Sequence, residues 1–197
     1  MARRSLVLAA TLVAALFLTG VALAAQVTIR VEGKTQSIFG SKPVTIDATN
    51  ALQALDIAST LGEFYYGITH SSFGDYVSQV GKYPGAGSAG WVFKVNGFSP
   101  PVGADQVQLK DGDSVLWYYA TFGANGGPPT LDLKALPGNC YSVTSYDDAG
   151  KASPAAGAVI HVDGRRVKAA DGKGCVGKHK GFVRAFSFGT VRSNSAK

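Results

Sequence analysis

The chain has 197 residues, with 19 Lys or Arg and 13 Asp or Glu side chains, so its formal net charge is +6. The charge is uneven, because residues 26–128 hold 6 basic and 8 acidic side chains (net −2), whereas residues 129–197 hold 11 and 5 (net +6). The basic part has no run of Lys or Arg with interleaved aromatic residues, which argues against nucleic-acid binding. The change of charge favours a domain boundary near residue 128.

The first 25 residues have the three zones of a secretory signal peptide. A positively charged start contains two arginines, an apolar run follows from Leu6 to Leu18, and small residues precede a predicted cleavage after Ala24 or Ala25. An uncleaved anchor is the alternative, but a membrane span needs about 20 apolar residues and this run is shorter. The sequence therefore predicts a secreted or envelope-associated protein that keeps no membrane span after cleavage.

The mature chain begins with the pattern of a small sheet and one helix. Apolar side chains alternate with polar ones over residues 26–31, as in a half-buried strand. The apolar period changes to three or four residues over 51–61, which predicts a helix that Thr49 or Asn50 caps and Gly62 ends. The following segment is interrupted by Gly and Ser, so we expect only a short strand at 77–80 and a flexible Gly/Pro loop at 82–90.

The clearest strand pattern lies at residues 91–95, before the pair Asn96-Gly97. This pair is favoured in tight turns because both residues tolerate positive φ. Asp111, Gly112 and Asp113 form a second turn, which leads into a strand at 114–120. Both faces of that strand are apolar or aromatic, so we expect it in the centre of a sheet. A calcium loop of EF-hand type would need further oxygen ligands at alternating positions, so a turn explains the two aspartates better.

Residues 90–119 read GWVFKVNGFSPPVGADQVQLKDGDSVLWYY. Their Gly-Trp, Asn-Gly, Gly-Ala-Asp and Lys-Asp-Gly-Asp motifs before an aromatic strand resemble the transcobalamin-like C-terminal domain family, a domain of unknown function. The resemblance covers residues 26–122 and implies a β-grasp-like fold, in which a small sheet holds one helix. In cobalamin carriers the related domain closes over a vitamin that a large helical barrel holds. This sequence lacks that barrel, so we expect neither cobalamin nor another cofactor.

The second half is predicted to be a small β-sandwich over residues 130–193, joined by a linker at 124–129 to a first domain at 26–123. Short strands are expected between Asp/Gly turns, without a helical period. They are placed at 131–133, 140–146, 158–162, 166–169 and 181–188. The segment AGAVIHVDGRRV…DGKGCV loosely resembles carboxypeptidase-regulatory and bacterial Ig-like modules. The whole chain is thus predicted to be mostly β with one helix (α+β).

The two cysteines, Cys140 and Cys175, both lie in this second half. Outside the reducing cytosol, two thiols in one small module most often pair, so the sequence predicts a disulfide. His161 and His179 lie near Cys175 in the sequence, which raises the alternative of a metal site. Spaced cysteine pairs of the zinc-site type are missing, and no metal is therefore expected.

Catalytic patterns are scarce in this sequence. His70 stands beside Ser71 and Ser72, with Asp75 nearby, and is the best starting point for a hydrolase. No nucleophile-elbow pattern surrounds any serine, however, and adjacency in sequence says little about the geometry of a triad. We therefore expect no enzyme, and we rank an extracellular hydrolase behind two non-catalytic functions.

Aromatic residues supply the remaining functional hint. Trp91 and Trp117 are expected in the core, because large aromatic side chains dominate the burial of small domains. Four others neighbour flexible, Gly-rich backbone and are predicted to form an exposed ligand-binding platform: Tyr65, Tyr66, Tyr83 and Phe98. Such a platform suits a glycan, a small planar ligand or an envelope protein. The sequence thus favours a binding protein of unknown ligand, the alternative being a purely structural envelope component held at an anionic surface by its basic half.

Overall fold

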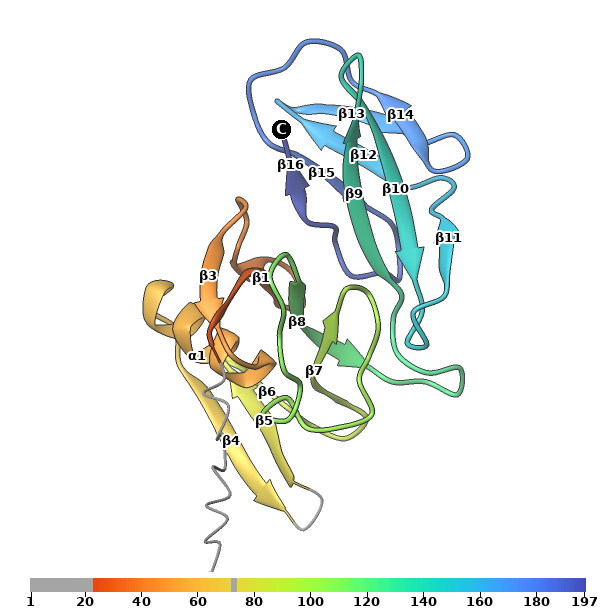
Figure 1. The fold of residues 1–197 in the computed structure, drawn as a ribbon. Helices are drawn as coiled ribbons and strands as arrows, with labels where there is room; N and C mark the ends of the chain where they lie inside the picture. Colours follow the sequence, from red (N-terminus) through yellow and green to blue (C-terminus); the bar gives the residue numbers. More distant parts are fainter. Residues whose placement is uncertain (1–22, 72–73) are drawn as a thin grey trace, which may run out of the picture.

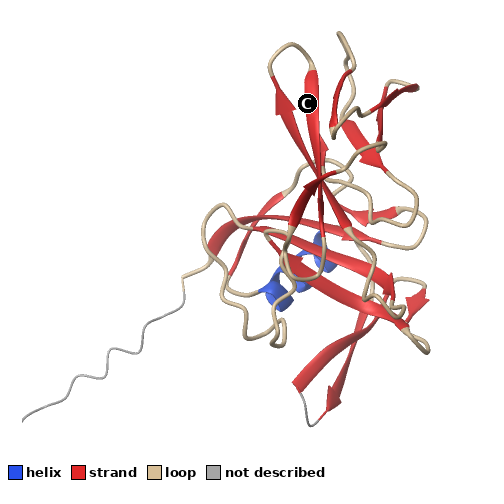
Figure 2. Ribbon diagram, turned by 90° about the vertical axis from the view of Figure 1, so that its right-hand side faces the viewer, coloured by secondary structure: helices blue, strands red, loops and turns tan. Residues whose placement is uncertain are grey.

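A computed structural model describes residues 23–71 and 74–197, and shows a mostly β protein with several sheets and one α-helix (Figures 1 and 2). The predicted fold class is therefore confirmed. The proposed signal peptide falls outside the described residues, except for its last three positions. Within the described part of the chain, no helix is both long enough and apolar enough to span a membrane.

The first half of the chain is built on a five-stranded sheet. Its strands are β1 (Ala25–Glu32), β2 (Ser37–Phe39), β3 (Thr45–Ala48), β7 (Ala89–Val95) and β8 (Ser114–Thr121). β8 pairs in parallel with β1 and antiparallel with β7, so it is central, as its two apolar faces predict. β7 lies at the edge of the sheet, and this position becomes important for the candidate site.

The helix α1 (Ala51–Leu61) begins and ends where the sequence predicts. Asn50 is the N-cap, and its side-chain oxygen accepts a hydrogen bond from the backbone N–H of Gln53 at 2.8 Å. Gly62 is the C-cap, and its N–H donates to the carbonyl oxygen of Ala58 at 2.9 Å. These bonds satisfy backbone groups that have no partner within the helix.

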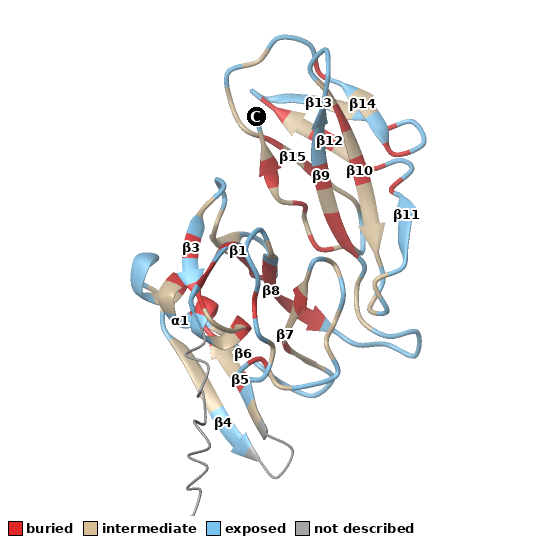
Figure 3. Ribbon diagram, in the orientation of Figure 1, coloured by how far each residue is buried: buried red, intermediate tan, exposed pale blue. Residues whose placement is uncertain are grey.

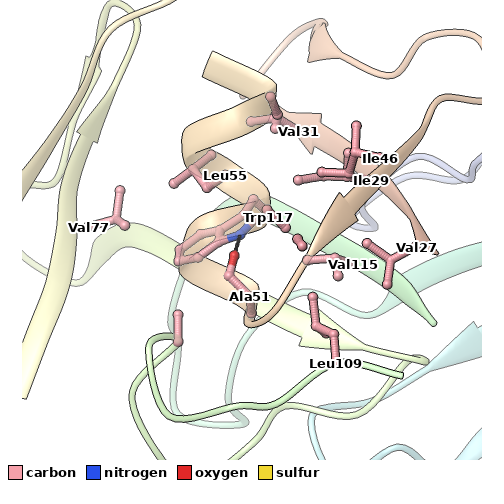
Figure 4. Close-up of a cluster of buried hydrophobic side chains, with 14 of the residues drawn as sticks. Val27, Ile29, Val31, Ile46, Ala51, Leu55, Val77, Leu109, Val115 and Trp117 are labelled. Carbon is pink, nitrogen blue, oxygen red and sulfur yellow. Dashed lines mark hydrogen bonds between the residues drawn. The ribbon is translucent and has the colours of Figure 1, made fainter. Parts of the chain in front are cut away.

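The core of the first half lies between α1 and one face of the sheet (Figure 4). The helix presents a buried face of small and branched side chains, namely Ala51, Ala54, Leu55 and Ala58. Trp117 of β8 packs against it at 2% exposure, and its indole N–H donates to the carbonyl oxygen of Ala51 at 3.1 Å. Trp91 is buried as well. Trp117 is buried while its indole N–H keeps a hydrogen-bond acceptor, so its burial stabilises this core.

A smaller antiparallel sheet projects from the first half, built from β4 (Tyr66–Ser71), β5 (Gly74–Val80) and β6 (Tyr83–Pro84) (Figure 1). The predicted strand at 77–80 lies within β5, but β4 and the start of β5 were missed, and β6 and the beginning of β7 replace the ends of the loop predicted at 82–90. Gly and Ser interrupt the alternation here, and the register shifts between Gly67 and Ile68. Both features hide the period-2 pattern on which strand prediction relies.

The second half contains two four-stranded sheets with a hydrophobic core between them. One sheet contains β9 (Thr130–Leu136), β10 (Cys140–Tyr146), β11 (Ala152–Pro154) and β14 (Lys173–Cys175). The other contains β12 (Val159–Val162), β13 (Arg165–Lys168), β15 (Val183–Phe186) and β16 (Ser195–Ala196). The sequence predicts five of these strands but not β11, β14 and β16, which have only two or three residues each. Buried positions gather on the inner strands of both halves (Figure 3).

The predicted disulfide is confirmed between Cys140 and Cys175, with an S–S distance of 1.99 Å. The two cysteines are directly opposite each other where β10 pairs with β14. The bond therefore joins the short strand β14 to the longest strand pair of its sheet, across a sequence separation of 35 residues.

The two halves meet around one buried carboxylate. Glu32, at the end of β1, is 1% exposed and accepts hydrogen bonds from Arg184 of β15 at 2.5 Å and from Nε of Arg192 at 2.9 Å. Arg30 lies 3.6 Å from the same carboxylate, and the Ser37 hydroxyl donates to it at 2.9 Å. Arg184 and Arg192, near the end of the chain, and Arg30 and Ser37, near its beginning, thus all contact the Glu32 carboxylate.

Arg30 is held in the same interface by backbone carbonyl groups. Its guanidinium donates to the carbonyl oxygens of Leu131 at 3.0 Å and Arg192 at 2.5 Å. Burial lowers the pKa of Arg30 to about 10, while the neighbouring Glu32 acts in the opposite direction. Arg30 therefore stays charged at neutral pH and needs the Glu32 carboxylate as its counter-charge.

Apolar contacts cover the face of the sheet opposite α1. Leu116, Tyr118 and Ala120 of β8 form a buried cluster with Val191 of the second half, and Val92 packs against it. This contact explains why β8 is apolar on both faces: one face packs under the helix and the other meets the second half of the chain.

The disulfide gives a first prediction. Replacing both Cys140 and Cys175 with alanine should lower the free energy of unfolding by roughly 3–4 kcal/mol, because a loop of this length is no longer closed in the unfolded chain. Urea unfolding followed by far-UV circular dichroism measures the change. The control Ser153→Ala, at an exposed position of β11, should stay within about 0.5 kcal/mol of the unaltered protein. Equal stability of the double variant would contradict the stabilising role.

The buried acid gives a second prediction. Glu32→Gln should lower the free energy of unfolding by roughly 3–5 kcal/mol, because three largely buried guanidinium groups lose their counter-charge. Differential scanning fluorimetry and urea titration both report this loss. Asp47→Asn, an exposed carboxylate of β3, is the matched control and should change little. A Glu32→Gln protein as stable as that control would show that Glu32 does not hold the halves together.

Candidate functional site

A cavity of about 290 Å³ lies between β5 and the edge strand β7. Its walls also include residues from β4, α1, β8, the loop at 99–104 and one turn of the second half. The lining residues are Leu52, Ile68, Asp75, Tyr76, Val77, Trp91, Val92, Phe93, Ser99, Pro100, Gly103, Ala104, Trp117, Tyr118, Phe122 and Asp148. A cavity that is mostly apolar, with a few polar groups, has the character of a small-molecule site.

The free edge of β7 supplies polar backbone groups to this cavity. The backbone hydrogen bonds at Ser88 and Asn96 show that even-numbered residues of β7 bond to β8. The odd-numbered Trp91 and Phe93 therefore direct their N–H and C=O groups away from β8, toward the free edge. Both residues line the cavity, so a ligand there would meet hydrogen-bonding groups as well as apolar walls.

The aromatic wall is fixed by contacts outside the cavity. The rings of Phe93 and Trp117 are stacked, with centroids 5.0 Å apart, and Trp91 meets Tyr119 edge-on at 5.7 Å. The indole N–H of Trp91 donates to the carbonyl oxygen of Tyr83 at 2.8 Å. Because these rings are held by neighbours and their N–H groups are satisfied, the wall is preorganised for apolar contact.

The second half completes the cavity through the turn between β10 and β11. Lys94 of β7 is fully buried, and its ammonium group donates to Thr130 Oγ1 at 3.3 Å and to the carbonyl oxygens of Tyr146 at 3.2 Å and Asp147 at 2.7 Å. Asp148 Oδ1 lies 3.5 Å from the same nitrogen, which is an ion pair rather than a hydrogen bond. Lys94 thus fixes the turn that brings Asp148 to the cavity.

The Asp148 carboxylate has one satisfied and one unsatisfied oxygen. Oδ2 accepts a hydrogen bond from the backbone N–H of Gly127 at 3.0 Å. Oδ1 is buried and accepts no hydrogen bond from any residue that the structure describes. This oxygen faces the Lys94 ammonium group and the neighbouring Tyr118, whereas the rest of the Asp148 side chain, which is 37% exposed, is open to the cavity.

Burial also shifts the pKa values of the groups around Asp148. It lowers the pKa of Lys94, although the nearby Asp148 acts in the opposite direction. Burial raises the pKa of Tyr118, and the Asp148 carboxylate raises it further. The tyrosine therefore stays neutral and can act as a hydrogen-bond donor in this part of the site.

The other acidic group of the cavity is Asp75 of β5. Its Oδ1 lies 2.7 Å from Nδ1 of His70, across the β4–β5 pair. The His70 side chain is 81% exposed, so water surrounds most of its ring. The serines that the sequence places beside it add nothing here, because Ser72 lies outside the described residues and the side chain of Ser71 is not described.

The four aromatic residues predicted as a platform do not line this cavity. Tyr65 and Phe98 are exposed. The hydroxyl of Tyr66 donates to Asp56 at 2.9 Å, and burial together with this bond raises the pKa of Tyr66 to about 12. Tyr83 packs on Tyr119, with ring centroids 6.1 Å apart. The platform remains a prediction, separate from the cavity.

The turn residues of the family-like motif make structural contacts. Asn96 and Gly97 both adopt positive φ (52° and 84°), as the tight turn requires. The side-chain oxygen of Asn96 accepts from the N–H of Ser114 at 2.9 Å, and its amide donates to Asp113 at 2.7 Å. Asp111 accepts from the N–H of Gln26 at 2.8 Å. Gly112 also has positive φ (84°). These residues tie strand ends together.

The alternative metal site at Cys175, His161 and His179 is not supported, because the sulfur of Cys175 is bonded to Cys140 in the disulfide. Nε2 of His179 lies 2.8 Å from the Tyr141 hydroxyl, and its Nδ1 lies 3.0 Å from the carbonyl oxygen of Gly181. Across residues 23–71 and 74–197, no group of three or more His, Cys, Asp or Glu side chains is arranged to hold a metal ion.

Residues 48–121 match the family model described as Domain of unknown function (DUF4430). The matched segment contains α1 and every cavity residue except Phe122 and Asp148. No curated protein matches the chain.

A solved structure with some similarity is a "putative metal binding protein" from Ruminococcus gnavus ATCC 29149. It is 16% identical, covers 48% of this chain and 95% of its own, and gives a TM-score of 0.37. A similarity this low carries no argument about the present chain.

Sequence reasoning missed the cavity, because its residues are scattered along the chain. Asp148 lies in a turn and Phe93 in a strand, far apart in the sequence. No local signal joins them, since a cavity between sheets depends on tertiary packing. The unusual position of a lysine in the otherwise apolar strand 91–95 was the one available hint that this strand contacts a polar partner.

Lys94 gives a third prediction. Lys94→Met keeps the length of the side chain but removes the donor to two backbone carbonyls and Asp148, so the free energy of unfolding should fall by roughly 1–3 kcal/mol. Thermal unfolding measures this change. Lys134→Met, at an exposed position of β9, is the matched control. If both variants melted together with the unaltered protein, Lys94 would not be what fixes the turn.

Proposed function

We propose that this protein is a non-enzymatic binding protein that holds a small, mostly apolar ligand between β5 and β7. The observation that carries the proposal is the cavity of about 290 Å³ with its wall of aromatic side chains. Its volume lies near the lower end of the range for small-molecule sites, roughly 300–1,000 Å³. The stacked rings of Phe93 and Trp117 supply a preformed apolar surface, and the edge of β7 supplies groups that would orient a bound molecule.

The proposal places binding within a secreted or envelope-associated molecule. The disulfide and the lack of a membrane-spanning helix among the described residues are compatible with that location. Export through residues 1–25, the division into domains at 26–123 and 130–193, and the resemblance of the first domain to transcobalamin-like domains belong to the proposal. So does the absence of a bound cofactor.

The fourth prediction tests occupancy of the cavity. Val92→Phe enlarges a half-buried lining residue and should abolish ligand binding by filling the space. Binding is followed through intrinsic tryptophan fluorescence, because the chain has two tryptophans and both line the cavity. The titrant is 2-phenylethanol, a small aromatic molecule, supported by native mass spectrometry of protein purified from culture medium.

The matched control is Val102→Phe, the same substitution at an exposed position of the neighbouring loop that does not line the cavity. It should bind as the unaltered protein does. Binding that persists at full strength in Val92→Phe, or a failure of the unaltered protein to bind any small aromatic probe, would refute the proposed function.

A further inference from the structure

We infer that the ligand of this cavity is an organic amine, whose positive charge meets Asp148 while its apolar part packs on the aromatic wall. This inference rests on the proposed function, because it names the ligand class of the same cavity. Two independent features of the described residues support it: the carboxylates of the lining, of which Asp148 is partly exposed, and the aromatic rings.

The lining is acidic. Its lining includes two carboxylates, Asp75 and Asp148, and no Lys, Arg or His is among the described residues that line it. Lys94 pairs with Asp148 but does not itself line the cavity. A site lined by carboxylates attracts a cation and repels an anion of the same shape, so charge selects among apolar ligands.

The Asp148 carboxylate keeps an exposed part that a ligand can reach, because its side chain is 37% exposed and lines the cavity. An ammonium group has three N–H donors, and those of Lys94 already reach Thr130, Tyr146 and Asp147. Oδ1 is buried and faces the lysine nitrogen at 3.5 Å as an ion pair, so the exposed part of the carboxylate is what a ligand would meet. A ligand amine would complete the carboxylate with a charge-assisted hydrogen bond, which is stronger than a bond to a neutral donor.

The aromatic wall favours the same class of ligand. Six of the lining residues are aromatic: Tyr76, Trp91, Phe93, Trp117, Tyr118 and Phe122. The faces of such rings attract cations, and tryptophan does so most strongly. Tyr118 already has the ammonium group of Lys94 5.9 Å from its ring centroid. The aromatic rings would contact the apolar part of an amine, and the carboxylates beside them would contact its ammonium group.

The fifth prediction compares two probes of equal shape, phenethylamine and 2-phenylethanol, which differ in the charged group. Isothermal titration calorimetry and tryptophan fluorescence at pH 7 should show the amine binding about 10-fold to 100-fold more tightly. The anion 3-phenylpropionate should bind more weakly than the alcohol. Rising salt should weaken the amine and leave the alcohol nearly unchanged.

The outcomes separate this inference from the proposed function. If the alcohol binds as tightly as the amine, the cavity is a binding site but the charge inference is overturned. If neither probe binds, the proposed function fails first. An amine that binds tightly to Val92→Phe would place its site elsewhere and would also overturn the inference.

Substitutions of the two cavity carboxylates test which residue recognises the positive charge of the ligand. In Asp148→Asn, the advantage of the amine over the alcohol should fall by about tenfold, while the affinity for the alcohol changes little. Asp47→Asn, an exposed carboxylate outside the cavity, is the matched control and should keep the full advantage. Asp75→Asn provides a second cavity variant if the first fails to fold, with a smaller loss of about threefold expected. An unchanged preference in a folded Asp148→Asn protein would overturn the role of that residue.

Discussion

The arrangement of the two halves depends on a single buried carboxylate. Glu32 has almost no contact with water, and three guanidinium groups from distant parts of the chain converge on it. Such a cluster is favourable only when all of its members are present, because each buried charge requires the others. The end of β1, the strand β15 and the segment at Arg192 must therefore meet in one geometry. A loose association of the halves is incompatible with this interaction.

That geometry has consequences for the candidate site. Once Glu32 positions the second half, Val191 covers the outer face of β8, and the turn after β10 reaches Lys94. Asp148 enters the cavity only because of this turn. The cavity is thus mainly a property of the first half, yet its charged end is supplied by the second. A ligand that contacts both parts would be linked energetically to their association.

Sequence reasoning succeeded where the signal is local. The helix at 51–61, the Asn96-Gly97 turn and the central strand at 114–120 all follow from periodicity or backbone preference, and the disulfide follows from redox chemistry. It missed β4, β6 and the first residues of β5, where glycines and a register shift obscure the alternation. It also missed the cavity, because packing brings Asp148 next to β7 across more than 50 residues. The predicted aromatic platform was chosen from loop composition, which carries no information about three-dimensional neighbours.

The free edge of β7 is a possible site for pairing with a second polypeptide chain. A strand that ends a sheet offers unpaired peptide groups, and two such margins from separate molecules can join into a continuous intermolecular sheet. Here the segment that could pair is short, since the Asn96-Gly97 turn ends it and the buried Lys94 interrupts its apolar character. The projecting β4–β5 hairpin stands beside it and restricts the approach of a second chain. The same shelter that leaves room for a small molecule thus keeps a second polypeptide chain away from this edge.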